Sequence, residues 1–489
     1  MPIDHGLLAK GKLLGPTPTP LVMVAVGACF AVATALLLVG AGSTAAILLP
    51  LAIATVLVAI SSPYWALVIT IAQFAFVPCE GELFGYFIPN VLQLLAPLCF
   101  GAALLYALKE ADHERLAPRA TDFFVGGFGI WGLVSMFASG VPYWKWYGNR
   151  MLFPMMLYFA VRLLPVDRKR VRMFILVALA AIALQSLLMI RESVAGSSPI
   201  YQVQRGLLEG IKPAKGPFPY MWNAGTYLVL WPSLFIYAIA SSRDSRKKLA
   251  WGGGLLVLLG AASRIMQRAP MLASLIAIAS CLVSPRLRRT TLIAMSVLAL
   301  AYVPWSMGRA GSGLISRFQL TDESRYAYRT AGINLLKSPN WDPIFGIGWG
   351  HFSRVSGRFG TEEEITVWEG RIDTVAEIAS GSALHNVWLA IPVEFGGVGT
   401  LLFLGILGCL GRAVWRIWRY PPTDVKVDDG LLVSMMGSLL ALAAIGYYQN
   451  IYTMPEAMSV LWVFYGLLTG QPSAFFEPRA ARTAREPNA

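Results

Sequence analysis

The chain has 489 residues, of which 56% are hydrophobic and only 14% are charged, and its formal net charge is +13. A soluble protein of this length would carry about 25% charged residues, so the composition excludes a water-soluble fold. The basic residues stand in short clusters between apolar runs, a pattern that indicates membrane topology and not a nucleic-acid-binding surface. Lipid cannot satisfy the backbone polar groups of long non-helical segments. The sequence therefore predicts an all-α, polytopic integral membrane protein.

Apolar runs of a length that can cross a bilayer as a helix recur from end to end. We expect about fourteen transmembrane helices, and at least twelve. Their predicted ranges are 21–41, 44–61, 63–78, 91–108, 122–139, 150–164, 172–190, 221–241, 249–263, 269–284, 291–307, 385–411, 430–448 and 456–470. The first run follows Lys10 and Lys12 as a signal peptide would, but the many later spans favour an uncleaved first helix.

The segments between these runs alternate in charge. Segments rich in Lys and Arg lie at 109–119, 165–172, 241–248, 284–289, 412–422 and near the C-terminus. The positive-inside rule places them, with both termini, in the cytoplasm. The alternate segments at 79–90, 139–150, 191–220, 308–384 and 447–456 are longer or poorer in basic residues and are predicted to lie on the outer side.

This pattern predicts one membrane domain with four parts. The N-terminal transmembrane helices occupy 1–307 and include a smaller outer loop at 191–220, and the large outer loop follows at 308–384. The C-terminal transmembrane helices occupy 385–470, and a basic cytoplasmic tail occupies 471–489. Apolar spacing predicts helices at 323–338 and 362–380 in the large loop. We expect this loop to fold against the membrane helices as a lid or vestibule.

Two pairs of arginines on the outer side are candidates for binding an anion. Charges at membrane depth cost about 2.5–3.5 kcal/mol, so they need a partner or a purpose. Arg264 and Arg268 lie four residues apart in a tight turn, where they are either interfacial arginines or a clamp for phosphate oxygens. Arg325 and Arg329 have the same spacing within 323–338, on either a solvated amphipathic helix or part of the same site.

The loop DPIFGIGWGHF at 342–352 carries Gly346, Gly348 and Gly350. The spacing is a weak match to a dinucleotide-binding fingerprint, because the third glycine comes too early and no strand precedes it. A tight backbone turn against the membrane surface is predicted instead. His351, which follows, is interpreted as structural.

A long apolar run opens with His385 and Asn386. A histidine at the start of a helix is either a cap or interface residue or a general base, because it titrates near neutral pH. Asn386 is interpreted as a helix cap or a hydrogen-bonding neighbour. The same run carries Pro392, Glu394 and three nearby glycines, which predict a kink and close helix approach, with a cavity beside His385.

Neither metal nor cofactor is predicted. The chain has four histidines and no His/Cys cluster at ligand spacing. Its five cysteines lie in or beside apolar runs and are interpreted as small apolar side chains. The acidic residues between 362 and 377 are more typical of a solvated helix face than of a cation site.

Three segments, taken in order, resemble a known family. They are the arginine turn at 261–270, SRYAYRTAGINLLKSPNWDPIFGIGWGHF at 324–352 and ALHNVWLAIPVEFGGVG at 383–399. This order resembles the O-antigen ligase and O-antigen polymerase superfamily of bacterial envelope glycosyltransferases. The resemblance covers roughly residues 215–410 and begins with KGPFPYMWNAGTYL at 215–228. The family's arginine turn matches either Arg264 or Arg268.

The resemblance implies a C-type glycosyltransferase fold. It also implies metal-independent, cofactor-free transfer of a glycan from a polyprenyl (undecaprenyl) diphosphate carrier to an acceptor at the periplasmic face of the inner membrane. The acceptor is a second lipid-linked repeat for a polymerase, and lipid A-core or a protein for a ligase. A lipid-linked oligosaccharide flippase, or another polytopic transporter, is the alternative from a different class.

The resemblance and the residue chemistry together assign roles to the candidate residues. The diphosphate is expected to be bound by Arg264, Arg268, Arg325 and Arg329. His385 is expected to accept a proton from the attacking hydroxyl, giving direct displacement with inversion at the anomeric carbon. Supporting positions are Asn386, Glu394, Gly346 and Gly348.

Overall fold

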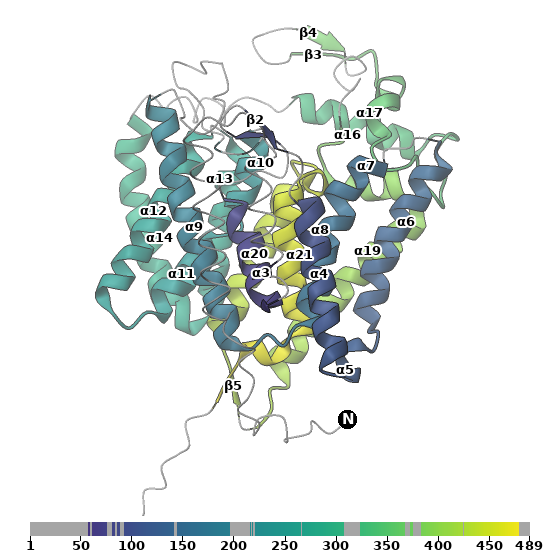
Figure 1. The fold of residues 1–489 in the computed structure, drawn as a ribbon. Coiled ribbons are helices and arrows are strands. Elements are labelled where there is room, and N and C mark those ends of the chain that lie inside the picture. Colours follow the sequence, from purple (N-terminus) through teal and green to yellow (C-terminus); the bar gives the residue numbers. More distant parts are fainter. Residues whose placement is uncertain are drawn as a thin grey trace, which may run out of the picture.

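The structure is a computed structural model of the full chain. It describes residues 57–58, 61–75, 81–83, 86–88, 92–140, 144–195, 216, 218, 221–265, 267–307, 323–366, 372–374, 383–423 and 425–478. This part of the chain is mostly helical, and its long helices run side by side in one bundle (Figure 1).

The long helices follow the predicted spans. The first seven are α3 (Pro63–Gln73), α4 (Leu92–Lys109), α6 (Ala120–Ala138), α8 (Phe153–Leu163), α9 (Arg168–Ala195), α10 (Met221–Leu228) and α11 (Pro232–Ser241). They are followed by α12 (Ser245–Arg264), α13 (Arg268–Ser280), α14 (Pro285–Met307), α19 (Val387–Arg419), α20 (Asp429–Gly446) and α21 (Pro455–Gly470). Each predicted span from 63–78 onward therefore coincides with helix, while 21–41 and most of 44–61 lie outside the described residues.

Short elements connect the long helices. The helical ones are α5 (His113–Leu116), α7 (Trp144–Tyr147), the π-helical turn η2 (Gly148–Leu152), α16 (Glu323–Leu336), α17 (Phe352–Val355) and the 3₁₀ turns η3 (Cys281–Val283), η4 (Ser356–Phe359), η6 (Ile451–Thr453) and η7 (Pro472–Phe475). Two antiparallel hairpins pair β1 (Gly81–Leu83) with β2 (Tyr86–Ile88) and β3 (Glu364–Thr366) with β4 (Ile372–Thr374). A third antiparallel pair joins β5 (Val425–Val427) to β6 (Phe476–Pro478), which are separated in the sequence by α20 and α21.

Six helical segments in the described part of the chain are long and apolar enough to cross a membrane. They are Leu92–Lys109, His113–Ala138, Arg168–Ala195, Met221–Ser241, Val387–Arg419 and Asp429–Gly446. Large apolar side chains such as Phe123, Ile130 and Leu401 are more than half exposed on these helices. A soluble protein would hide such residues, whereas lipid solvates them. The chain is a multi-pass membrane protein.

Helices far apart in the sequence pack together in the bundle. Helix α8 packs against α4 and α21, α6 against α19, and α13 against α20. The segment Met221–Ser241 and helix α20 are mostly buried inside the protein, whereas α4, α6 and α19 are mostly not. The former two therefore lie in the centre of the bundle, and the latter three have faces open to lipid.

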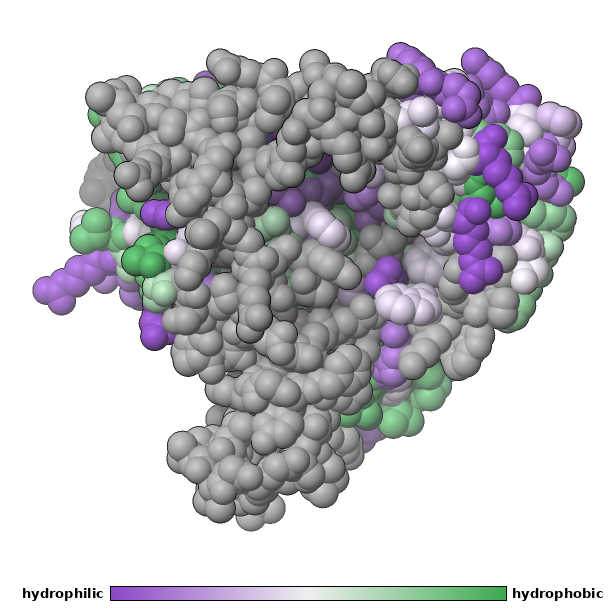
Figure 2. Space-filling model, turned by 90° about the horizontal axis from the view of Figure 1, so that it is seen from above, coloured by the Kyte–Doolittle hydropathy of each residue, from purple (hydrophilic) through white to green (hydrophobic). Residues whose placement is uncertain are grey.

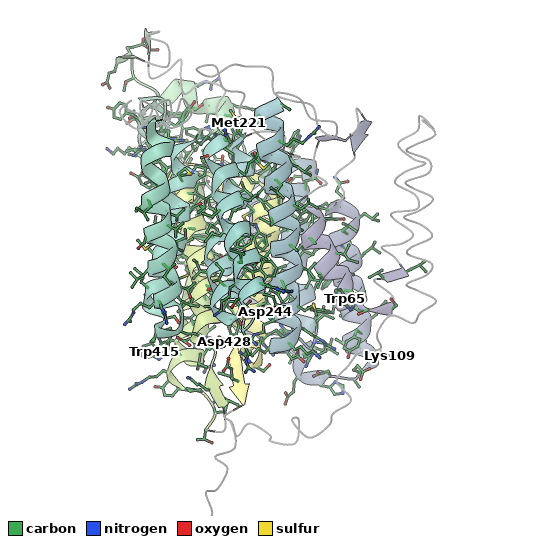
Figure 3. The ribbon with its side chains drawn as sticks, turned by 90° about the vertical axis from the view of Figure 1, so that its left-hand side faces the viewer. Trp65, Lys109, Met221, Asp244, Trp415 and Asp428 are labelled. Carbon is green, nitrogen blue, oxygen red and sulfur yellow. The ribbon has the colours of Figure 1, made fainter. Side chains whose placement is uncertain are left out.

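The bundle has two chemically different ends. Lys109, Asp244, Trp415 and Asp428 lie at one end, which we call the basic end, and Met221 lies at the other (Figure 3). Helices α16 and α17 and the β3–β4 hairpin also lie at this second end, which we call the loop end (Figure 1). The basic segments and the candidate site residues thus occupy opposite ends, as the alternation of charge predicts.

The large loop between α14 and α19 confirms one predicted helix and contradicts the other. Helix α16 coincides with the predicted helix at 323–338. The helix predicted at 362–380 is wrong for residues 364–366 and 372–374, which form the β3–β4 hairpin instead. These strands contain Ile365, Thr366, Ile372 and Thr374, and β-branched side chains favour extended backbone.

Helix α19 is broken at Gly396, whose φ is 66° and ψ −165°. The kink predicted for this run is therefore confirmed, and it occurs at a glycine because side-chain-bearing residues avoid this conformation. The break releases carbonyl groups from the helix. The main-chain N–H groups of Ile347 and Gly348 donate to the carbonyls of Val393 and Glu394, both at 3.0 Å, and Gly397 donates to Pro343 at 2.7 Å.

The predicted glycine turn at 342–352 is confirmed, and its role is to complete this broken helix. Gly346, Gly348 and Gly350 all have positive φ angles, of 68°, 86° and 74°. A Cβ atom on Gly346 would lie 2.6 Å from the backbone nitrogen of Gly396, so only glycine allows the two backbones to approach this closely. From helix α6, Trp131 donates to the Phe395 carbonyl at 2.9 Å and Ser135 to the Glu394 carbonyl at 2.9 Å.

At the basic end, an ion-pair cluster fastens the end of the described chain to the bundle. Asp428 is fully buried and accepts from Arg168 at 2.7 Å and Arg286 at 3.1 Å. Both arginines also bind Glu477 on strand β6, which pairs with β5. Burial raises the pKa of Asp428, but hydrogen bonds and charges from these arginines outweigh burial and hold that pKa below its usual value. Part of the predicted tail at 471–489 is thus packed under the bundle.

The substitution Gly396→Ala is expected to destabilise the protein by about 1–3 kcal/mol through backbone strain, because a Cβ atom would also lie 2.3 Å from the Ile344 carbonyl oxygen. The free energy of unfolding in mild detergent, titrated with a denaturing detergent, measures the effect. Gly411→Ala, on the same helix with nothing within 4 Å of the added Cβ, is the matched control. Equal stability of the two variants would contradict the proposed role of the break.

The substitution Asp428→Asn is expected to lower stability at neutral pH by about 1–3 kcal/mol, because the partly exposed arginines around it lose their buried counter-charge. The native pKa of Asp428 is lowered, so its contribution is present above the unfolded pKa and is lost as pH falls through the folded pKa. The stability difference from the unaltered protein should therefore narrow below about pH 4. Asp244→Asn, an exposed helix cap at the same end, is the control and should change little.

Candidate functional site

Residues 447–453 join α20 to α21 at the loop end and contact several of the candidate residues. The guanidinium carbon of Arg325 lies 5.3 Å from the ring centre of Tyr448. That of Arg329 lies 5.1 Å from the ring centre of Tyr447, whose hydroxyl accepts a hydrogen bond from Arg329 at 2.9 Å. These cation–π contacts order both arginines of α16 without cancelling their charge.

The same loop is connected to the turn between α12 and α13. Gln449 is buried, accepts from Thr226 at 2.7 Å and donates to Gln267 at 3.3 Å. Gln267 immediately precedes Arg268, the first residue of α13, while Arg264 is the last residue of α12. Both arginines are half-buried. No described residue forms a hydrogen bond or an ion pair with Arg264.

His385 lies against helix α16. Its ring centre is 5.0 Å from that of Tyr328, with 36° between the ring planes. Asn386 is the helix cap, because its side-chain oxygen accepts from the backbone N–H of Leu389 at 3.1 Å. The prediction of a cap at Asn386 is confirmed, and capping is therefore not the role of His385. The half-buried imidazole of His385 is therefore interpreted either as an interface residue or as a group for proton transfer.

Glu394 is 2% exposed and accepts a hydrogen bond from the Tyr452 hydroxyl at 2.7 Å. The backbone of Gly350 and Phe352 also faces this carboxyl group. Burial, and then the neighbouring Glu394 carboxylate, raise the pKa of Tyr452 well above its usual value, so the phenol stays protonated and donates. Glu394 therefore joins the glycine turn to the loop at 447–453.

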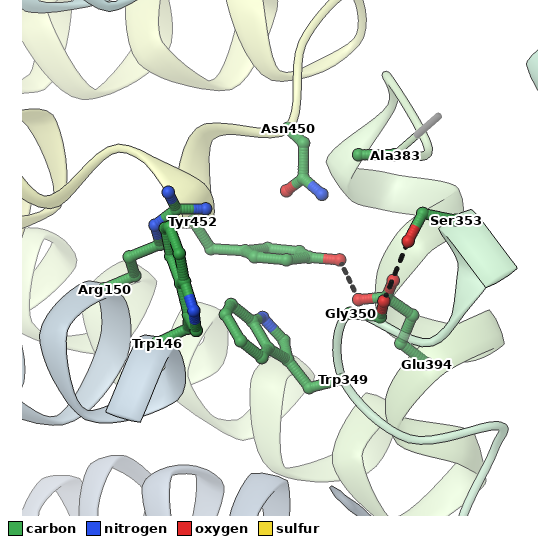
Figure 4. A pocket seen from close by; sticks show the side chains of 9 residues that line it. All are labelled: Trp146, Arg150, Trp349, Gly350, Ser353, Ala383, Glu394, Asn450 and Tyr452. Carbon is green, nitrogen blue, oxygen red and sulfur yellow. Dashed lines mark hydrogen bonds between the residues drawn. The ribbon is translucent and has the colours of Figure 1, made fainter. Parts of the chain in front are cut away.

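Glu394 and Tyr452 line a cavity of about 180 Å³, which we call the polar pocket. Trp146 and Arg150 lie on one side of it, Gly350 and Glu394 on the other, and the Tyr452 ring extends across the middle (Figure 4). The remaining lining residues are Trp349, Ser353, Ala383 and Asn450. Seen from the loop end, the surface is hollowed near its centre, and hydrophilic residues line part of the hollow (Figure 2).

An apolar cavity of about 310 Å³ lies beside helices α19, α20 and α21. Its lining begins at Val387 and Trp388, two and three residues after His385, and reaches Leu410 further along α19. Tyr452 lines both this apolar cavity and the polar pocket. The two cavities thus share one lining residue.

The predicted residues form two groups in the structure, one around α16 and the α12–α13 turn and one in the glycine turn. Arg325, Arg329 and His385 lie on or against α16, and Arg268 follows the residue that Gln449 binds. Gly346 and Gly348 hold the turn against α19, and they line neither the polar pocket nor the apolar cavity. His351, whose Nδ1 lies 2.9 Å from the Ile347 carbonyl oxygen, belongs to the same turn, as expected for a structural residue. Within the described residues, no three His, Cys, Asp or Glu side chains are grouped to hold a metal ion.

Sequence reasoning missed several polar-pocket and loop residues. Arg150 stacks on Trp146 with its guanidinium carbon 4.4 Å from the ring centre, and their four-residue spacing in WKWYGNR is the signal that could have identified them. The aromatic and amide run YYQNIY at 447–452 is the second missed signal. No protein-family model matches the chain, and no curated protein matches it.

Proposed function

We propose that the protein is an inverting membrane glycosyltransferase that transfers a glycan from a polyprenyl diphosphate carrier to an acceptor sugar. The observation that carries this proposal is the convergence of the α12–α13 turn, helix α16 and the start of α19 on the loop at 447–453. These elements bring arginines and a histidine to one end of a membrane bundle. The proposal includes the C-type fold, about fourteen spans with cytoplasmic termini, and a site at the outer face of a bacterial inner membrane.

The arginines would bind the diphosphate. Guanidinium groups match phosphate oxygens with a two-pronged fork and stay charged at every accessible pH. The stacking of Arg325 and Arg329 on tyrosine rings supports this role, because it orients the side chains before a ligand arrives. Such preorganised charge stabilises the negative charge that grows on the diphosphate as the glycan leaves.

His385 would be the general base. As the acceptor hydroxyl attacks the anomeric carbon, the carbon–oxygen bond to the diphosphate breaks and the imidazole takes the hydroxyl proton. The apolar cavity that begins at Val387 suits the prenyl chain of the carrier, since it lies next to His385 and continues along the membrane helix. The diphosphate and the anomeric carbon would then lie between the chain and the arginines.

A purified-enzyme assay tests the proposal against its main rival. A glycosyltransferase forms a new glycosidic bond in detergent from a polyprenyl-diphosphate-linked glycan, whereas a flippase needs a sealed compartment and forms no bond. Two acceptors, a second lipid-linked repeat and a lipid A-core, distinguish a polymerase from a ligase. Absence of any new glycosidic bond with either acceptor, from protein that remains folded, would overturn the proposal.

The substitution His385→Ala is expected to lower the transfer rate by about 10²–10⁴, the usual contribution of a general base. Folding should be little changed, because Asn386 and not His385 caps the helix. His113→Ala, an exposed histidine at the basic end, is the matched control and should keep the full rate. Near-normal transfer by the His385 variant would refute its assignment as the base.

The substitution Arg325→Lys is expected to lower the transfer rate by roughly 10²–10³ relative to the unaltered protein, the effect of losing one electrostatic donor. One ammonium group cannot reproduce the guanidinium fork or its stacking on Tyr448. The initial rate at saturating acceptor measures the effect, with Arg358→Lys on the exposed surface of the large loop as control. Full activity of Arg325→Lys would contradict the assignment of Arg325 to diphosphate binding.

A further inference from the structure

The polar pocket combines an exposed aromatic side chain with buried hydrogen-bonding groups. Trp146 is 47% exposed, whereas Glu394 and Tyr452 are 2% and 3% exposed. The Arg150 guanidinium lies over the Trp146 ring and fixes it at the rim of the pocket. Arg150 itself belongs to the π-helical turn η2, an irregularity that often marks functional sites. This composition, an aromatic ring beside convergent polar groups, is typical of small-ligand sites.

Trp349 adds a buried donor to the pocket wall. Its side chain is 3% exposed, and its ring packs edge-on against Tyr147 with centres 5.3 Å apart. Its indole N–H has no hydrogen-bond partner among the described residues. A buried donor left without an acceptor is costly, so a ligand or water oxygen in the pocket would stabilise it.

The charges and the volume of the polar pocket limit the kind of ligand that it can bind. Arg150 and Glu394 oppose each other, so the lining has no strong excess of either charge. Arg150 and Trp349 are donors, the Glu394 carboxylate is an acceptor, and Asn450 is both. Hydroxyl groups match such a mixed set because each one donates and accepts. A cavity of about 180 Å³ suits one sugar ring and is too small for a lipid chain or an oligosaccharide.

We propose that the polar pocket is a subsite for one neutral pyranose ring of a glycan substrate. Trp146 would stack on the C–H face of the ring, and Trp349, Arg150 and Glu394 would bind its hydroxyls. The place of this subsite in the reaction rests on the proposed function. Ala383 lines the pocket two residues before His385, and Asn450 lies on the same loop as Tyr448, which stacks on Arg325. The ring bound here therefore belongs to the donor glycan or to the acceptor.

Steady-state kinetics of the full-length protein in detergent tests the subsite with two variants. Trp349→Phe removes the indole N–H together with the volume of one ring, and it is expected to raise KM for one glycan substrate about two- to tenfold, with little change in kcat. The smaller ring leaves a void, so the thermal unfolding midpoint should fall modestly, and by a similar amount when a buried tryptophan outside the pocket is replaced in the same way. Trp146→Ala removes the stacking ring and should raise the same KM, and Trp146→Phe should restore part of the affinity.

Matched controls separate binding from packing. Trp231→Phe removes another buried indole N–H that has no partner among the described residues but lies outside the pocket. Trp415→Ala removes an exposed tryptophan at the basic end. Neither control should change KM. A rise confined to the lipid-linked substrate assigns the ring to the donor, and a rise confined to the second substrate assigns it to the acceptor.

A second measurement does not depend on transfer. Saturation-transfer NMR with methyl glucoside, galactoside, mannoside and N-acetylglucosaminide should show at least one signal that both pocket variants weaken and both controls leave unchanged. Methyl glucuronide should give less signal, because an ionised carboxylate loses its hydration in a partly buried pocket whose own charges already balance. An active enzyme with unchanged KM values and variant-insensitive NMR signals would overturn the subsite alone. An inactive protein with variant-sensitive sugar binding would overturn the proposed function and keep the subsite.

Discussion

The docking of the glycine turn onto the break in α19 is the interaction on which the rest of the site depends. A helix inside a bilayer cannot leave carbonyl groups unsatisfied, because no water is available to replace the lost hydrogen bonds. The carbonyls of Val393 and Glu394 are instead satisfied by the backbone of residues 347 and 348, and that of Phe395 by Trp131. Residues 342–350 therefore complete the hydrogen bonding of the membrane helix, although they belong to the large loop.

This docking fixes the position of the chemical groups near it. Helix α16 precedes the turn and packs against α19, which brings Tyr328 against His385 and places Arg325 over Tyr448. Two residues before the break, Glu394 lines the polar pocket and accepts a hydrogen bond from Tyr452. A loop of 308–384 could reach many positions above a bundle. Its described residues are held in one of them because three glycines allow backbone to meet backbone.

The predictable and unpredictable parts of the structure differ in the range of the interactions that determine them. Local hydropathy predicts the spans from 63–78 onward. Charge predicts the two ends of the helix bundle, and glycine content predicts the kink in α19. The capping role of Asn386 does too, because an N-cap needs only the next helical turn. The pocket residues Arg150 and Tyr452 could not be placed this way, since they share a pocket with Glu394 only because η2 and η6 pack beside α19. Tryptophan and tyrosine near membrane ends are also common as interface anchors, which hides those that line a site.

The failure at 362–380 has a similar cause. Spacing of apolar residues suits a helix there, but the β-branched residues at 365, 366, 372 and 374 favour strands, and the pairing of β3 with β4 decides the outcome. The spacing of apolar residues indicates which face of a helix could be buried. It does not indicate whether the segment has a partner strand. A short hairpin at the edge of a loop satisfies its backbone groups through that partner, whereas a helix would satisfy them alone.

Arginines at the two ends of the bundle have different kinds of partner. At the basic end, Arg168 and Arg286 share two carboxylates, and the charges are largely neutralised where the terminal strand is fastened. At the loop end, Arg329 is ordered by the ring and hydroxyl of Tyr447, and no carboxylate of the described residues pairs with it. An aromatic face fixes the direction of a guanidinium while leaving its positive charge in place. Arg329 is therefore ordered and still carries a charge that no described carboxylate compensates, which supports the proposed binding of an anionic diphosphate.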